Sequence, residues 1–213
     1  MLNNTKNSMK KIIKRRKDGV IQSYWIGKNQ TRILNRKGRG QKKKNIYECV
    51  RRRVFFSFHY ERDAIRAAQV RNSNVVKNKS IEASDFIDAA KWEEVKRCGE
   101  EAIKRWIENQ ISGTSVTAVL IGAKTSERKW IKHEIDESLK RGNGLLAIYI
   151  HKCPLFDGRT DTKGKNPFDN LSIEKNGQKK YLSEIYSAYD WFDDNGRENL
   201  GYWIEEAARK AGR

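Results

Sequence analysis

The sequence predicts an α/β fold in which a parallel sheet is flanked by helices. Two patterns lead to this prediction. Short, almost entirely apolar runs are typical of strands that are covered on both faces. The segments between these runs place apolar residues at helical spacing. Buried strands that alternate with amphipathic helices form crossover units, and such units build parallel sheets with helices on both faces.

Three runs have the length and composition of buried strands. They occupy residues 54–58, 116–121 and 145–150 and consist mainly of Val, Ile, Leu, Ala and Phe. The longest of these runs is far shorter than the roughly 18 apolar residues that a membrane-spanning helix needs. We therefore expect strands at these positions and no membrane partner.

Three stripes of apolar residues predict the helices around these strands. The stripe before the central strand comprises Val95, Ala102, Ile103, Trp106, Ile107 and Ile111. The stripe after it comprises Ile131, Ile135 and Leu139, with Thr125 and Ser126 as the expected N-cap and residues 142–144 as the exit. The stripe near the C-terminus comprises Leu200, Trp203, Ile204, Ala207, Ala208 and Ala211, and Gly212 closes it.

The connection over residues 151–180 interrupts this alternation. It contains both prolines of the chain, Pro154 and Pro167, among Asp, Gly, Lys and Asn. The composition predicts a long connection without regular structure, and connections of that kind are usually functional or flexible. Aromatic residues return over 181–192, and we expect this segment to pack on the domain before the last helix.

Positive charge is concentrated at the N-terminal end. Residues 1–53 contain 18 Lys or Arg against two acids, Asp18 and Glu48, and so carry +16 of the formal net charge of +18. Self-repulsion and few apolar residues predict a basic, flexible, low-complexity extension over residues 1–50 and one domain over residues 51–213. Within the extension, residues 20–26 could form a short strand or an anchor.

The basic extension leaves two functional interpretations open. Residues 1–53 have the composition of an arm that binds nucleic acid, with Tyr24, Trp25 and Tyr47 available to stack on bases. Basic low-complexity extensions that only add solubility have the same composition. Composition alone does not separate these two.

Other patterns indicate a cytoplasmic protein without a resident metal. The basic start is not followed by the apolar segment of a secretory signal, and three widely spaced cysteines form neither a disulfide framework nor a zinc ligand set. The histidines His59, His133 and His151 lack metal-ligand spacing. Phosphate loops of the Walker type and the GxGxxG, GxSxG and HExxH motifs do not occur in the sequence. We therefore expect no cofactor.

One candidate site lies at the end of the first domain strand. Ligands of open α/β sheets bind beyond the carboxyl ends of the strands, where the strand order reverses. The strand at residues 54–58 runs into Ser57, Phe58, His59 and Tyr60, which bring a hydroxyl, an imidazole and a phenol to one strand exit. A polar strand-to-helix turn without a ligand would look the same.

A second candidate lies on the helix after the central strand. Trp130 and Glu134 are four residues apart and so share one face of that helix. Glu134 lies beside the apolar stripe, so we expect it to be partly desolvated and suited to stabilising a developing cation. The alternative is an ordinary ion pair with Arg128 or Lys132. Glu100, on the preceding helix, is equally ambiguous.

Several segments, in order, resemble a known family. They are residues 54–63 (VFFSFHYERD), 69–73 (QVRNS), Asp88 and Trp92 in a D-A-x-x-W-E pattern, 114–122 (TSVTAVLIG), 125–135 with R-K-W and E-I, 166–169 (NPFD), 189–191 (YDW) and 193–196 (DDNG). Together they resemble the TIR-like family that includes the TIR protein of the bacterial Thoeris anti-phage system. The resemblance runs from about residue 54 to the C-terminus. Ile131 stands where the family pattern has Val.

This resemblance implies a flavodoxin-like TIR fold and, in catalytic members, cleavage of the nicotinamide–ribose bond of NAD+. NAD+ would then be a substrate and not a cofactor. Such members often cyclise the ADP-ribose product into a nucleotide signal that activates an effector partner. Assembly through TIR–TIR contacts is also implied. Other members are non-catalytic adaptors, and this remains the alternative function.

The resemblance also assigns roles to individual residues. Glu134 takes the role of the carboxylate that stabilises an oxocarbenium-like ribose, with Glu100 as the alternative. The residues that would bind the substrate are Ser57, Phe58, His59, Tyr60, Asp88, Trp92 and Trp130.

Overall fold

The computed structural model describes residues 10–15, 21–26, 51–73, 81–84 and 89–213. The chain divides into two compact units, Met1–Ile46 and Tyr47–Arg213. In the first unit, β1 (Lys10–Arg15) and β2 (Ile21–Ile26) pair as an antiparallel ribbon. The predictions of a flexible extension over residues 1–50 and of a boundary at residue 50 fall mainly on residues 1–9, 16–20 and 27–50, outside the described residues.

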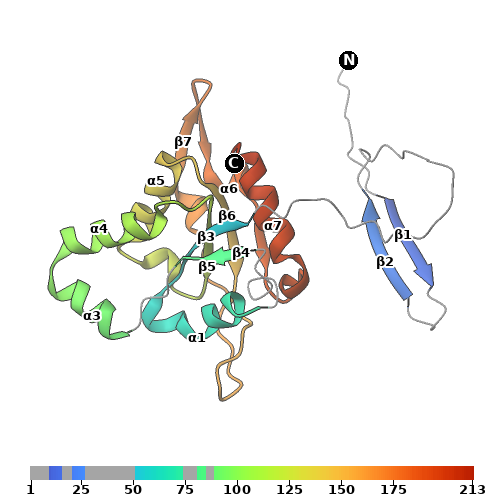
Figure 1. Ribbon diagram of the computed structural model, residues 1–213, viewed down its shortest axis with the longest axis horizontal. Coiled ribbons are helices and arrows are strands. Elements are labelled where there is room, and N and C mark those ends of the chain that lie inside the picture. Colours follow the sequence, from blue (N-terminus) through green and yellow to red (C-terminus); the bar gives the residue numbers. More distant parts are fainter. Residues whose placement is uncertain (1–9, 16–20, 27–50, 74–80, 85–88) are drawn as a thin grey trace. The chain divides into compact units, whose positions relative to one another are not determined.

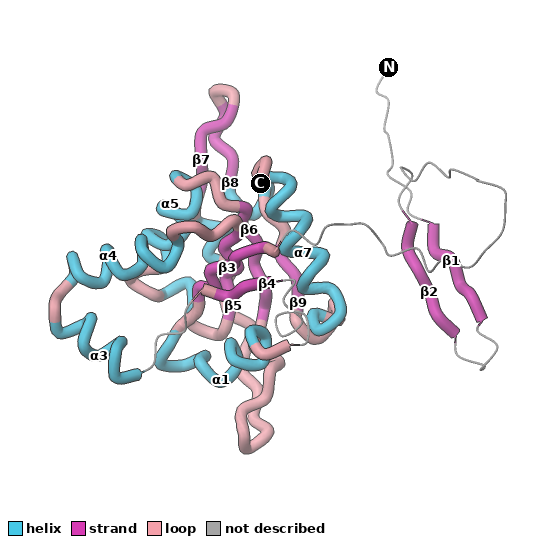
Figure 2. The backbone as a smooth tube through the Cα atoms, in the orientation of Figure 1, coloured by secondary structure: helices cyan, strands magenta, loops and turns pink. Residues whose placement is uncertain are grey.

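The second unit contains a parallel sheet of five strands in the order β4-β3-β5-β6-β9 (Figures 1 and 2). The strands are β3 (Arg52–Ser57), β4 (Ile81–Ala83), β5 (Val116–Ile121), β6 (Gly144–Tyr149) and β9 (Ala188–Asp190). Each neighbouring pair is parallel, and in the register Val54 lies opposite Val116, which lies opposite Gly144. The three predicted strands are therefore present and the predicted α/β class is confirmed.

Helices cover both faces of this sheet. They are α1 (Tyr60–Arg71), α3 (Ala89–Arg97), α4 (Glu100–Ile111), α5 (Ile131–Lys140), α6 (Leu182–Ile185) and α7 (Gly196–Lys210). In β3, Val54 and Phe56 pack in the core shared with α1 and α7, whereas Phe55 packs with α4, because side chains alternate along a strand. The sheet is thus the middle of three layers.

Two helix predictions need correction. The first stripe is not one helix: α3 ends at Arg97, and Gly99, with a φ of 88°, separates it from α4. Thr125 does not cap the next helix. It begins a short 3₁₀ helix, η1 (Thr125–Glu127), its hydroxyl accepts from the Gly122 amide, and α5 starts only at Ile131. The stripe near the C-terminus is confirmed as the buried face of α7.

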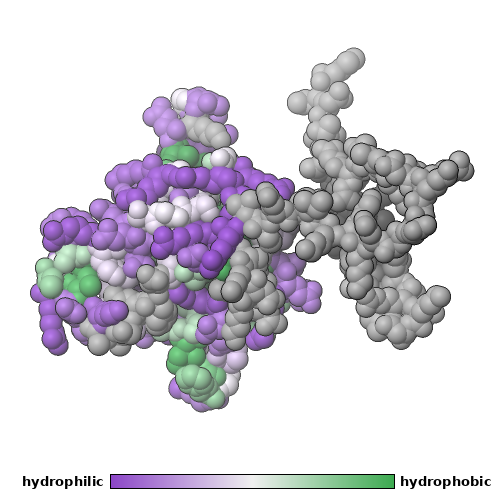
Figure 3. Space-filling view, viewed as in Figure 1, coloured by the Kyte–Doolittle hydropathy of each residue, from purple (hydrophilic) through white to green (hydrophobic). Residues whose placement is uncertain are grey.

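The connection over residues 151–180 is more ordered than predicted. It contains a second 3₁₀ helix, η2 (Pro167–Asn170), and an antiparallel hairpin formed by β7 (Ser172–Lys175) and β8 (Gln178–Tyr181). The hairpin projects from the domain on one side, and the loop after β6 projects on the other (Figure 1). The face of the domain seen in Figure 3 is mainly hydrophilic, with an apolar patch on the loop after β6. Phe156, which belongs to this loop, is 94% exposed.

Within the described part of the chain, no helix combines the length and the apolar character needed to cross a bilayer.

Candidate active site

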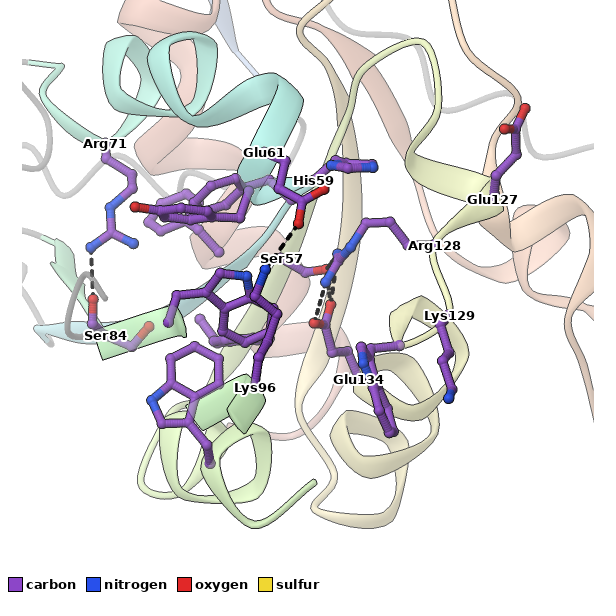
Figure 4. Close-up of a pocket in the computed structure, with 17 residues that line it drawn as sticks. Ser57, His59, Glu61, Arg71, Ser84, Lys96, Glu127, Arg128, Lys129 and Glu134 are labelled. Carbon is purple, nitrogen blue, oxygen red and sulfur yellow. Dashed lines mark hydrogen bonds and ion pairs between the residues drawn. The ribbon is translucent and has the colours of Figure 1, made fainter. Parts of the chain in front are cut away.

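A cavity of about 340 Å³ opens at the carboxyl end of β3 (Figure 4). β3 comes before its two neighbours in the chain, and the next strands, β4 and β5, lie on opposite sides of it. The strand order therefore reverses at β3, and ligands of open α/β sheets bind at such a reversal. The residues that line the cavity are 55–61, Arg71, Ser84, Trp92, Lys96, Trp106, 127–130 and Glu134.

Ser57 and Glu134 meet at one wall of this cavity. Ser57 ends β3 and, two positions after Phe55, faces the same side of the sheet as α4 and α5. Glu134 lies in the first turn of α5, which packs on that side. The Ser57 hydroxyl donates a hydrogen bond to Oε2 of Glu134. Both residues are buried, with only 3% of Glu134 exposed.

Arg128 completes this polar corner. Its Nη2 donates to Oε1 of Glu134 at 2.6 Å and its Nη1 to Oε2 at 3.1 Å, so the pair is bidentate. Nη1 also lies 3.3 Å from Oγ of Ser57. Burial in the cavity wall and an ion pair with Arg128, which the sequence presented as alternatives for Glu134, therefore occur together. Burial removes water from the carboxylate, and the guanidinium compensates its charge.

Aromatic rings form a further part of the cavity wall. The ring of Tyr60 lies 6.3 Å from those of Phe58 and Trp92, and Trp92 contacts Trp106 edge to face at 5.6 Å. Nε1 of Trp92 is buried and has no hydrogen-bond partner among the described residues. A wall of flat rings with one available donor suits a planar heterocycle.

Cationic side chains at the cavity are held by neighbouring carboxylate and carbonyl oxygens. Lys96 pairs with Glu93 at 2.6 Å and with Glu61 at 3.3 Å, and these contacts, led by that with Glu93, raise the pKa of Lys96. Arg71 donates to the Ser84 carbonyl oxygen at 2.8 Å. The cavity is therefore lined by both signs of charge. Groups of three His, Cys, Asp or Glu that could hold a metal were not found in the described ranges.

The structure brings most of the predicted site residues together. Those that line the cavity are Ser57, Phe58, His59, Tyr60, Trp92, Trp130 and Glu134. Glu100 does not line the cavity. Its side chain is 62% exposed and pairs with Lys129 on the outside of the helices. Asp88 lies outside the described residues.

Ten of the residues that line the cavity were not predicted as site residues, among them Arg128, Trp106 and Arg71. Arg128 was considered only as a possible ion-pair partner and as part of the R-K-W match, and Trp106 only as part of an apolar stripe. Arg71 belongs to the QVRNS segment but had no assigned role. The available signal for the aromatic wall was a pair of tryptophans, Trp106 on the predicted apolar stripe and Trp92 in the D-A-x-x-W-E pattern.

The fold and the cavity define a TIR-like α/β domain with a buried carboxylate at the switch point of its sheet. The family described as Thoeris protein ThsB, TIR-like domain, matches residues 55–154. A protein of Bacillus cereus (strain MSX-D12), provisionally named cyclic ADP-D-ribose synthase ThsB1, is 33% identical over 191 residues, covering 72% of this chain and 98% of the relative. The chain belongs to this Thoeris TIR-like family.

Proposed function

We propose that this chain cleaves the bond between nicotinamide and ribose in NAD+ and converts the ADP-ribose part into a cyclic nucleotide. The observation that carries the proposal is the burial of Glu134 in the wall of the switch-point cavity, hydrogen-bonded by Ser57. The provisional name of the Bacillus cereus relative, a cyclic ADP-D-ribose synthase, supports the same reaction.

The chemistry needs a fixed negative charge near the reacting carbon. The C1′–N1 bond breaks, its electron pair passes to the pyridinium nitrogen, and neutral nicotinamide leaves. The ribose is then an oxocarbenium ion, which a carboxylate in a dry site stabilises more strongly than water does. Capture by a nucleophile of the same molecule gives a cyclic product, and capture by water gives ADP-ribose. Either nucleophile loses one proton.

The other walls of the cavity fit the rest of the substrate. Trp92, Tyr60 and Trp106 offer ring faces and edges to a nicotinamide or adenine ring. In this proposal NAD+ is the substrate and the site needs no resident cofactor. The cyclic product would act as the signal that reaches an effector partner in anti-phage defence, and assembly through TIR–TIR contacts would regulate the site.

The test is incubation of the purified full-length chain with NAD+, followed by chromatography of nicotinamide and of the nucleotide products. Glu134→Gln should abolish nicotinamide release, whereas Glu100→Gln, which changes an exposed glutamate outside the cavity, should retain it. The same comparison in phage-infected cells tests the case in which catalysis requires a trigger from the phage. NAD+ levels that do not change in those cells, together with protection that survives Glu134→Gln, would favour the adaptor function instead.

A further inference from the structure

The pairing of Arg128 with Glu134 conflicts with the role proposed for Glu134. Both carboxylate oxygens are occupied: Oε1 accepts from Nη2, and Oε2 accepts from Nη1 and from Ser57. A carboxylate whose charge is already compensated by a bidentate guanidinium stabilises a second cation weakly. The pair must therefore open, or be exchanged, when the reaction takes place.

The position of Arg128 allows such an exchange. It belongs neither to η1 nor to α5: it follows Glu127 in an extended conformation, with φ −66° and ψ 134°. The anchors of this segment lie before it, at Thr125, whose hydroxyl donates to the Leu120 carbonyl at 3.3 Å, and after it, at the start of α5. Its side chain lines the cavity and is 12% exposed. The guanidinium can therefore turn from Glu134 into the cavity without moving a helix.

Two of the other cations at the cavity are engaged at its edge. Lys96 pairs with two glutamates and Lys129 with Glu100, and their side chains are 33% and 63% exposed. Exposed ion pairs contribute little, because water and salt screen them. Arg128 is more deeply buried than Lys96 and Lys129. Its planar guanidinium can donate two hydrogen bonds to one phosphate group.

We propose, on the basis of the function proposed above, that Arg128 binds the diphosphate of the dinucleotide and thereby releases Glu134. NAD+ carries a positive pyridinium ring and a negative diphosphate. The substrate can therefore exchange one buried ion pair for two, with Arg128 on the diphosphate and Glu134 on the ribosyl-nicotinamide end. Each charge keeps a partner throughout, which avoids the large cost of an unpaired buried charge. Once neutral nicotinamide leaves, the Arg128–Glu134 pair can form again.

This exchange makes a prediction about binding that does not depend on turnover. Glu134 competes with an anionic ligand for Arg128, so removing the charge of Glu134 should tighten the binding of ADP-ribose, which has a diphosphate and no pyridinium. Removing Arg128 should weaken it. Nicotinamide riboside, which has the pyridinium and no phosphate, should behave in the opposite way, because Arg128 competes with it for Glu134.

The experiment measures dissociation constants for ADP-ribose and nicotinamide riboside from the tryptophan fluorescence of the full chain, since Trp92, Trp106 and Trp130 line the cavity. We expect Arg128→Gln to weaken ADP-ribose binding about tenfold, and Glu134→Gln to tighten it severalfold. Arg128→Lys should fall between Arg128→Gln and the unchanged protein, because it keeps the charge but loses the fork.

Two controls keep the result interpretable. Arg141→Gln removes an arginine that pairs with Glu137 at the far end of the same helix, and should leave both constants unchanged. The double variant Arg128→Gln/Glu134→Gln is neutral at both positions, so it avoids a lone buried charge, and should still bind ADP-ribose weakly. Equal losses for both ligands in Arg128→Gln, or unchanged ADP-ribose binding, would overturn the proposal. Lack of NAD+ cleavage by the unchanged protein, both purified and in phage-infected cells, would instead refute the proposed function.

Discussion

Ser57 at the end of β3 donates its hydroxyl hydrogen to the buried carboxylate of Glu134 at the start of α5. The two residues are 77 positions apart in the chain, and the sheet brings them together because β3 and β5 are neighbours. This contact joins the two candidate sites found in the sequence, the strand exit and the helix face, into one cavity. The first prediction follows from it.

Ser57→Ala should lower kcat for NAD+ cleavage about tenfold and change KM little. The substitution removes one hydrogen bond that orients Glu134, and bonds to charged groups contribute about 1.5–3 kcal/mol. Glu134 keeps its ion pair with Arg128, so the fold should persist. Steady-state nicotinamide release measures the effect, with Ser115→Ala, at the opposite end of the sheet, as the control. A change confined to KM would show that Ser57 binds substrate and does not orient the carboxylate.

Trp92→Ala should raise KM for NAD+ about fivefold, with a smaller effect on kcat. Trp92 lies between Tyr60 and Trp106 in the aromatic wall, and contacts between aromatic rings contribute about 1 kcal/mol. Trp92→Phe should keep most of the affinity. Tyr202→Ala, a 60% exposed aromatic on α7, is the control. If KM stays constant in Trp92→Ala, the wall does not bind the substrate.

Local composition was sufficient to predict the buried strands. Residues 116–121 are buried at every position of β5, so the near-continuous apolar run matched its environment directly. The split between α3 and α4 was missed because Val95 and Ile103 pack in the same core and therefore share one apolar pattern. Only the left-handed φ of Gly99 marks the break, and a glycine alone does not predict that conformation.

The candidate site was only partly predictable. The sequence identified Ser57 and Glu134 separately, and the family resemblance linked them. The bidentate geometry of Arg128 could not be predicted, because it depends on the extended residue between η1 and α5, which has no periodic pattern. The hairpin of β7 and β8 was missed for a different reason: its strands alternate weakly, and Asn176-Gly177, a pair typical of tight hairpin turns, was read as part of a loop.

Gly144→Ala should destabilise the domain by about 2 kcal/mol. Gly144 begins β6, and a Cβ atom there would collide with the backbone of α7 at the carbonyl of Ala207. Backbone cannot turn aside as a flexible side chain can, so α7 would have to shift from the sheet, and overpacking of this kind typically costs about 1–3 kcal/mol. Urea unfolding followed by circular dichroism measures the change. Ser183→Ala, exposed on α6, should change stability by less than about 0.5 kcal/mol. Equal stability of Gly144→Ala and the unchanged protein would show that close packing of the Ala207 backbone on Gly144 does not hold α7 on the sheet.

His151 should make the domain less stable in mild acid. It lies just after β6 with 7% of its surface exposed, and burial lowers its pKa below the ordinary value of 6.5, an effect that Asp190 partly offsets. The other charged groups around it are Lys152, Lys163 and Asp193. The unfolded chain binds the proton at a higher pH than the folded chain. The contribution of neutral His151 to the free energy of unfolding is therefore fully present above about pH 6.5 and is lost as the pH falls through the folded pKa. The urea midpoint should therefore be lower at about pH 5.5 than at about pH 7.5, and His151→Gln should reduce that difference. An identical difference in the variant would assign the pH dependence to other groups.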